Sequence, residues 1–152
     1  MPDLINDTQK KVLCFGEVLW DILPFGPLLG GAPLNFAYRL NSLGGTALLA
    51  TRVGADEWGD RILSEMQRLS MDTALVQRDP EHVTGIVNVD LSDATSPRYT
   101  IVTDVAYDYI EPTPALSLAA SRADCIYFGS LSQRWEPKSA RRRKLTATRG
   151  ST

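Results

Sequence analysis

Residues 30–37 read GGAPLNFA, and this stretch decides how the chain is expected to fold. Two glycines interrupt an extended segment, and Pro33 suits the first turn of a helix because its fixed φ and missing N–H are tolerated there. The helix that starts near Pro33 should end at the glycine pair 44–45. We expect its buried face to be formed by four apolar residues, Phe36, Ala37, Leu40 and Leu43.

The segment before this helix predicts extended structure. Residues 11–15, KVLCF, form a short apolar run that ends at a glycine, as is typical of a buried parallel strand. Residues 18–23 continue extended with Asp21 in their middle, and residues 25–33 are dense in Gly and Pro. We therefore predict a strand, a second extended segment and a loop that leads into the helix.

The segment after the helix repeats the pattern. Residues 47–53 form another apolar strand, and Asp56 can cap the helix that follows. The apolar positions of that helix recur at helical spacing: Trp58, Ile62, Met66 and Leu69. Strands that alternate with helices over short connections indicate an α/β fold with parallel strands and right-handed crossovers.

The next part of the chain changes character. Residues 84–91 alternate, and a turn returns the chain along residues 98–103, which predicts an antiparallel hairpin with one mostly polar face. A helix over residues 114–122 and a buried strand over residues 124–128 should follow. The chain is thus expected to form one domain over residues 1–133, with a hairpin inserted into its α/β pattern.

The last residues, 134–152, have a different composition. They hold seven basic residues against one acidic residue, whereas the whole chain has a formal net charge of −2. We interpret them as a disordered basic tail, because they show no periodic apolar pattern. A nucleic-acid interface is disfavoured, since the cluster 141–144 has no aromatic residues between its charges. No apolar run approaches the ~18 residues that span a membrane, and no signal peptide is recognisable, so we expect a cytoplasmic protein.

Cysteine and histidine are scarce. Cys14 and Cys125 lie in apolar segments, and we expect both to be buried free thiols of a reduced compartment. The single histidine, His82, excludes a site built from several histidines and lies in a polar stretch typical of the surface. Trp20 is expected in the core, whereas Tyr99 and Tyr107 could either fill the core or stack on a ligand.

Four residues around the glycine pair suit a binding site. Gly30 and Gly31 let a ligand approach the backbone because they carry no Cβ. Asn35 offers an amide that both donates and accepts, and the Asp21 carboxylate can accept from two neighbouring hydroxyls. Both groups should lie beyond the carboxyl ends of parallel strands, where ligands bind in open α/β sheets. The set suits an uncharged polyhydroxylated molecule, although a plain glycine loop would fit the local pattern equally well.

Taken together, these residues resemble the N-terminal signature of the ribokinase and phosphofructokinase-B family of carbohydrate kinases. The matching positions are Gly30, Gly31, Pro33, Asn35, Ala37, Gly44 and Gly54. The flanking stretches FGEVLWDIL and TRVGADEWGD look most like fructokinases, and the resemblance covers about residues 11–133. It implies a three-layer ribokinase-like fold with a parallel central sheet and a β-hairpin lid, truncated before its C-terminal half.

The resemblance also implies a function. Asp21, Gly31 and Asn35 match positions that hold sugar hydroxyls, with Gly30 shaping the loop. The segments at about 17–24 and 84–104 correspond to a lid that closes over the sugar and, in some relatives, forms a homodimer. Relatives transfer a phosphoryl group from ATP, with Mg²⁺ bridging the phosphates. The expected partner is therefore a small sugar, most like fructose.

One departure from the family limits that expectation. Relatives are about twice as long, and their C-terminal half carries a Gly-Ala-Gly-Asp motif that supplies the catalytic base. Residues 54–56, Gly-Ala-Asp, lack the second glycine, and we interpret Asp56 as a helix cap. No Gly-rich phosphate motif occurs either. We therefore assign no catalytic, ATP-binding or metal residue, and the abrupt change at the tail looks like a frame change or a truncated gene model.

Two alternatives to a sugar-binding kinase part remain open on the sequence. A non-catalytic sugar-binding or dimerisation module could use the same scaffold, and a nucleoside kinase of the same family would share the signature. In either case an uncovered strand near residues 125–128 should promote self-association.

Overall fold

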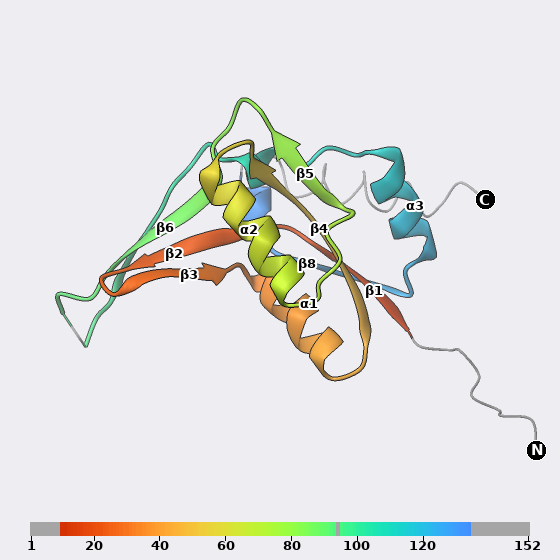
Figure 1. The fold of residues 1–152 in the computed structure, drawn as a ribbon, viewed down its shortest axis with the longest axis horizontal. Helices are drawn as coiled ribbons and strands as arrows, with labels where there is room; N and C mark the ends of the chain where they lie inside the picture. Colours follow the sequence, from red (N-terminus) through yellow and green to blue (C-terminus); the bar gives the residue numbers. More distant parts are fainter. Residues whose placement is uncertain (1–9, 94, 135–152) are drawn as a thin grey trace, which may run out of the picture.

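The computed structural model describes residues 10–93 and 95–134, which form a layered α/β body and a second sheet that projects from it (Figure 1). Strands and helices alternate through the body, as predicted from the sequence. In chain order the elements are β1 (Lys11–Phe15), β2 (Leu19–Leu23), β3 (Gly26–Gly30), α1 (Ala32–Ser42), β4 (Thr46–Gly54), α2 (Glu57–Arg68), β5 (Val76–Asp79), β6 (Gly85–Asp90), β7 (Arg98–Ile101), the 3₁₀ helix η1 (Ala106–Tyr109), α3 (Pro114–Arg122), β8 (Cys125–Phe128) and the 3₁₀ helix η2 (Leu131–Gln133).

The main sheet has the strand order β5-β4-β1-β8, and all its neighbouring strands run parallel. Successive residues of β1 point to opposite faces of this sheet. Cys14 packs in one cluster with Leu34 of α1 and Met66 of α2. Leu13 packs on the other side with Leu116 of α3. Helices therefore cover both faces, which confirms the three-layer architecture.

Helix α1 has nearly the predicted bounds, but its buried face differs from the prediction. Leu34 and Ala37 are buried, whereas Leu43 is 77% exposed and Phe36 is 39% exposed. The helix packs against the sheet through Leu34. Phe36 therefore lies at the side of the helix, where its ring stacks on that of Tyr127 in β8 with centroids 4.2 Å apart. The prediction for Phe36 and Leu43 was wrong because spacing alone does not fix which side of a helix meets the sheet.

The second sheet, which we call the lid sheet, has the order β3-β2-β6-β7. The predicted hairpin is present as β6 and β7, and β6 lies parallel to β2. The loop predicted over residues 25–33 was wrong for Gly26–Gly30, because this segment pairs antiparallel with β2 as β3. Pro27 is compatible with β3 because this strand lies at the sheet edge, where a missing N–H breaks no ladder.

Three further differences concern the edges of the main sheet. Strand β8 was predicted to be buried, yet Cys125 is exposed because β8 is the last strand of the sheet in the described part of the chain. Cys14, on the central strand β1, is buried as expected, and burial raises the pKa of its thiol to about 12. At the other edge, β5 (VQRD) was not predicted because it has no apolar run. Among the described helices, none is long and apolar enough to cross a membrane.

Candidate functional site

The four predicted site residues lie where the main sheet meets the lid sheet. Strand β1 has β4 on one side and β8 on the other, so the chain changes direction at β1. Such a switch point leaves a crevice at the carboxyl ends of the strands, which is the usual binding position in open α/β sheets. From β1 the chain enters β2, turns into β3 and reaches α1 at Gly31. Asp21, Gly30, Gly31 and Asn35 all lie on this path.

Asp21 lies against Gly30. It occupies the middle of β2, and a Cβ built on Gly30 would come within 2.5 Å of its Oδ2 atom. The carboxylate is partly buried, and this desolvation raises the pKa of Asp21. Within the described part of the chain, no group donates a hydrogen bond to it. Its oxygens are therefore free to accept from a ligand.

Gly31 holds the turn into α1. Its φ is +115°, and a Cβ at this position would collide with the carbonyl oxygen of Glu17. Both features require glycine, because an L side chain is strained at this φ and has no space. Gly31 thus packs directly against the backbone of Glu17 and Val18, and this contact fixes where α1 begins.

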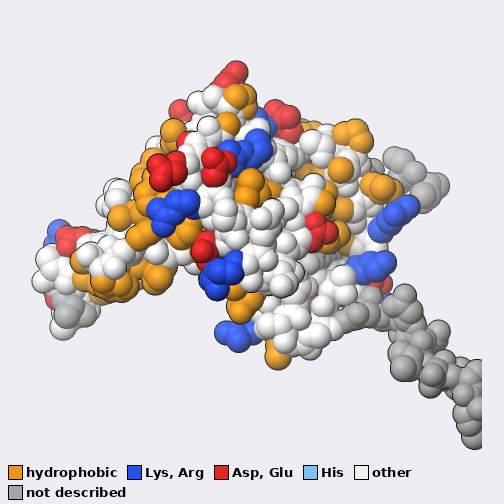
Figure 2. All heavy atoms as spheres, viewed as in Figure 1, with side chains coloured by type: hydrophobic (Ala, Val, Ile, Leu, Met, Phe, Trp, Pro, Cys, Tyr) orange, Lys and Arg blue, Asp and Glu red, His pale blue; other side chains and the backbone are white. Residues whose placement is uncertain are grey.

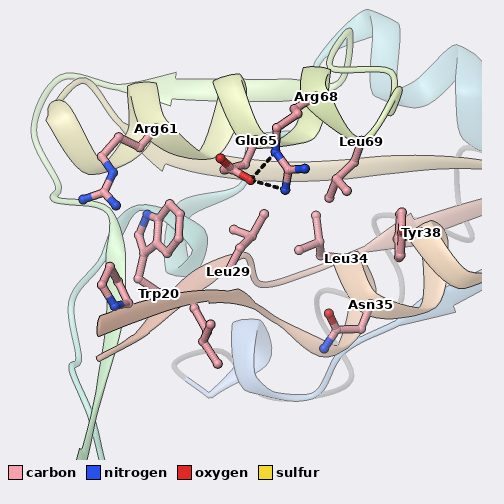
Figure 3. Close-up of a pocket in the computed structure, with 11 residues that line it drawn as sticks. Trp20, Leu29, Leu34, Asn35, Tyr38, Arg61, Glu65, Arg68 and Leu69 are labelled. Carbon is pink, nitrogen blue, oxygen red and sulfur yellow. Dashed lines mark hydrogen bonds and ion pairs between the residues drawn. The ribbon is translucent and has the colours of Figure 1, made fainter. Parts of the chain in front are cut away.

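Asn35 lies one turn into α1. Its backbone N–H donates to the carbonyl of Gly31 at 2.9 Å, while its side chain is exposed. Figure 3 shows the Asn35 amide turned away from the ion pair between Glu65 and Arg68. The structure therefore brings Asp21 onto the glycine pair and starts the helix of Asn35 from it. That one sugar contacts both side chains stays a prediction.

A pocket of about 440 Å³ lies between α1, α2 and the lid sheet (Figure 3). Asn35 is the predicted site residue that lines it, whereas Asp21 and the two glycines do not. Its remaining lining is Trp20, Pro27, Leu28, Leu29, Leu34, Tyr38, Arg61, Glu65, Arg68 and Leu69. Trp20 and its register partner Leu29 line the pocket from one face of the lid sheet, whereas Leu28, the register partner of Asp21, belongs to the other face.

Trp20 is a core residue, as predicted. It is 3% exposed, and its indole N–H donates to the carbonyl of Trp58 at 3.1 Å. The guanidinium of Arg61 lies over both rings, 5.0 Å from the centroid of Trp20 and 4.6 Å from that of Trp58. This stack joins the lid sheet to α2. The sequence did not decide whether Tyr99 and Tyr107 belong to the core. In the structure Tyr107 is fully buried, whereas Tyr99 is 64% exposed.

The sequence analysis missed a group of buried polar residues beside the predicted site. Glu17 lies two residues after the end of β1 and is 5% exposed, while Ser132 in η2 is fully buried. Burial raises the pKa of the Glu17 carboxyl, and the amides of Glu17, Ser132 and Ala32 offset only part of this rise. In the sequence, β1 and β8 both end in a Phe that is followed by Gly, but this shared feature does not by itself show that Glu17 is buried.

Arg134, which the sequence analysis placed in the tail, is the last described residue and contacts the body. Its guanidinium donates to both carboxylate oxygens of Asp108, at 3.0 and 2.7 Å. It also lies 5.3 Å from the ring centroid of Tyr107, whose pKa burial raises to about 12. The other positions of the predicted tail, 135–152, lie outside the described residues.

We assign no magnesium or nucleotide site within the described residues. No three His, Cys, Asp or Glu side chains among them gather as metal ligands. Asp56, whose motif resembled a catalytic one, caps α2 by accepting from the N–H of Gly59 at 2.8 Å. It also accepts from the N–H and hydroxyl of Thr84, so it is fully engaged in structure. No chemical step through ATP or Mg²⁺ is therefore assigned to these residues.

Comparison with known proteins agrees with this architecture. The sequence profile of the pfkB family carbohydrate kinases matches residues 3–142. A putative sugar kinase of Pyrococcus horikoshii is 37% identical over 89 residues, which cover 59% of this chain and 28% of that protein. A fructokinase of Escherichia coli is 32% identical over 111 residues, which cover 69% of this chain and 36% of that protein.

Solved structures give the same result for the fold. The crystal structure of the Pyrococcus horikoshii sugar kinase aligns with a TM-score of 0.78 and 27% identity, over 91% of this chain and 49% of that one. A fructokinase of Xylella fastidiosa with bound ATP aligns with a TM-score of 0.75 and 23% identity, over 92% of this chain and 46% of that one. The chain thus spans half or less of the length of these relatives.

Proposed function

Because the chain belongs to the pfkB family of carbohydrate kinases, we propose that it is the sugar-binding N-terminal part of an ATP-dependent, fructokinase-like enzyme. Fructose is the proposed sugar, since a fructokinase is among the relatives. A cytoplasmic location is part of the same proposal.

The observation that supports this proposal is the environment of the Asp21 carboxylate. Its carboxylate is partly buried, lies on Gly30 and receives no hydrogen bond within the described chain. A carboxylate that is removed from water needs donors, and the hydroxyls of an uncharged sugar supply them. The exposed amide of Asn35 can both donate and accept, so it would hold a further hydroxyl.

Phosphoryl transfer would require a donor and a catalytic base in addition to these sugar-binding residues. ATP, bound with Mg²⁺ in the intact kinase, would supply the phosphoryl group, and the groups that hold it and the catalytic base would come from the C-terminal half of the relatives. Asp21 and Asn35 would orient the sugar, and the lid sheet would keep water away from it. We therefore propose that the 152-residue chain by itself transfers little or no phosphate.

A second candidate is a non-catalytic module that binds sugar or pairs through its lid. The exposed apolar side chains of the lid favour pairing: Leu28, Tyr99 and Ile101 are 53%, 64% and 41% exposed. Their registers with Asp21, Val89 and Val87 place them on one face of the lid sheet. Figure 2 shows hydrophobic side chains gathered over the β2–β3 end of the lid. A homodimer through this face would cover them.

Calorimetric titration of the chain with fructose, ribose and adenosine, without ATP, tests the binding site. We expect fructose to bind and Asp21→Asn to weaken it by at least about tenfold, the loss of a charge-assisted hydrogen bond. Asp72→Asn, an exposed carboxylate in the turn after α2, is the matched control and should bind like the wild type. Binding of adenosine in place of fructose would instead favour a nucleoside kinase.

An ADP-release assay with the same sugars tests the chemistry. We expect no turnover above background for the isolated chain. Measurable turnover on any sugar would refute the proposal that the chain is inactive alone. Failure to bind any sugar, together with a stable dimer in size-exclusion chromatography, would favour the dimerisation module.

A further inference from the structure

Two neighbouring strands of the main sheet, β1 and β8, end in the same way. Phe15 and Phe128 are register partners, and each is followed by a glycine. The side chain of Glu17 lies in the space that Gly129 leaves, because a Cβ on Gly129 would collide with the Glu17 carboxylate. A carboxylate is thus seated directly over the end of the neighbouring strand, inside the crevice of the switch point.

The backbone of Glu17 also contacts the Gly30–Asn35 loop, which leads into α1. Its carbonyl oxygen occupies the position that a Cβ of Gly31 would need. Its carboxylate faces the backbone amides of Ala32, the first residue of α1, and of Ser132 in η2. One side chain therefore joins two segments that are about a hundred residues apart in the sequence, the loop that leads into α1 and the turn after β8.

The cluster around Glu17 contains buried polar atoms that no described group satisfies. These atoms are Glu17 Oε2 and Ser132 Oγ. A buried polar atom without a partner lowers the stability of the fold, and a carboxylate lowers it more than a neutral group of the same shape. A neutral side chain at position 17 would therefore give a more stable fold. Groups that lower stability in this way are concentrated at functional sites.

We infer that Glu17 is a positioning residue, which holds the Gly30–Asn35 loop against the Gly129–Gln133 turn so that the sugar-binding groups keep their mutual geometry. The gain for sugar binding rests on the proposed function. The link between the two segments does not, and it can be measured without a sugar. Charged groups near the cluster are Asp108 and Arg134, which pair with each other beside Tyr107.

The substitution Glu17→Gln tests this role in the full chain. Glutamine keeps the shape, but its NH₂ cannot accept from a backbone N–H, so the amides of Ala32 and Ser132 no longer share one acceptor group. Hydrogen–deuterium exchange should become about tenfold faster in the peptides covering residues 30–36 and 129–134, and fructose binding should weaken by about tenfold. The melting temperature at pH 8 should not fall, because a buried charge has been removed.

Glu81→Gln removes an exposed carboxylate and is the matched control, with unchanged exchange and binding expected. Glu17→Asp keeps the charge but shortens the side chain, and it should loosen the same two segments; it replaces Glu17→Gln if that variant fails to fold. Unchanged exchange in either segment, or faster exchange throughout the main sheet with a lower melting temperature, would overturn the inference. Linked loosening in a protein that binds no fructose would support the positioning role and refute the proposed function.

Discussion

The main sheet and the lid sheet have four strands each, yet they are stabilised to different extents. Six of the nine residues of β4 are buried between two helical layers, whereas all four residues of β7 are exposed. The lid sheet contacts the body near its base, where Leu19 and Val87 pack with Tyr107 and the indole of Trp20 donates to the carbonyl of Trp58. Stability therefore resides in the body, whereas the lid sheet exposes apolar side chains.

The largest contrast should appear when one aliphatic side chain is truncated in each sheet. Leu49 on β4 is 2% exposed, and Leu49→Ala should lower the free energy of unfolding by about 3 kcal/mol, because it leaves a cavity between sheet and helices. Ile101→Ala in the lid, at a position 41% exposed, should cost less than about 0.5 kcal/mol. Urea denaturation measures both values. Equal losses would show that the two sheets unfold as one equally packed unit.

The next largest effect on the free energy of unfolding is expected at a hydrogen-bonded contact between the body and the lid sheet. Asp56 caps α2 and also accepts from the N–H and hydroxyl of Thr84, immediately before β6. Asp56→Ala should cost about 2 kcal/mol at pH 7, since a cap and a connection to the lid are lost together. Asp60→Ala, which removes only an exposed ion pair with Arg78 on the same helix, should cost less than about 1 kcal/mol.

The pH dependence of the Asp56 effect has a definite sign. Burial by itself would raise the pKa of Asp56, but the bonds from Thr84 and Gly59 outweigh it and lower the pKa. A lowered pKa in the folded state adds stability that is present above the usual carboxyl range, about pH 4, and disappears as the pH falls through the folded value. The difference between wild type and Asp56→Ala should therefore shrink below about pH 4. A difference independent of pH would show that the cap acts without its charge.

The same contrast explains what the sequence could predict. The body follows local rules: apolar runs such as residues 11–15 gave β1, and Asp56 marked the start of α2. The lid does not, because Gly26 and Pro27 suggest a loop and become a strand only through pairing with β2. The sequence also does not show which strands form the edges of a sheet. Cys125, on the edge strand β8, was therefore wrongly expected to be buried.

Glu17 shows why part of the candidate site escaped sequence analysis. The signature residues of the Gly30–Asn35 loop lie within six consecutive positions, so their spacing can be recognised in the sequence. Glu17 is buried by Gly129 and Ser132, which lie far away in the chain. A charged residue inside an apolar run gives no local indication that the fold will enclose it.

A smaller effect on stability, of opposite sign, is expected at Asp21, on the boundary between body and lid. Burial raises the pKa of this carboxyl, so its contribution to stability is full below the usual carboxyl pKa and is lost as the pH rises through the folded value. Asp21→Asn should therefore melt slightly above the wild type at pH 8 and equally at pH 3.5. A lower melting temperature of the variant at pH 8 would show that the carboxylate has a stabilising partner.

The smallest effect on stability, with a large effect on association, is expected on the exposed lid face. Tyr99→Ser removes a ring that is 64% exposed, so the free energy of unfolding should change by less than about 0.5 kcal/mol. If the lid face pairs two copies, the same change should shift the elution of the chain toward the monomer in size-exclusion chromatography, because aromatic side chains dominate such contacts. Tyr38→Ser on α1, at a position 37% exposed, is the control and should leave elution unchanged. An equal shift in both variants would place the contact outside the lid.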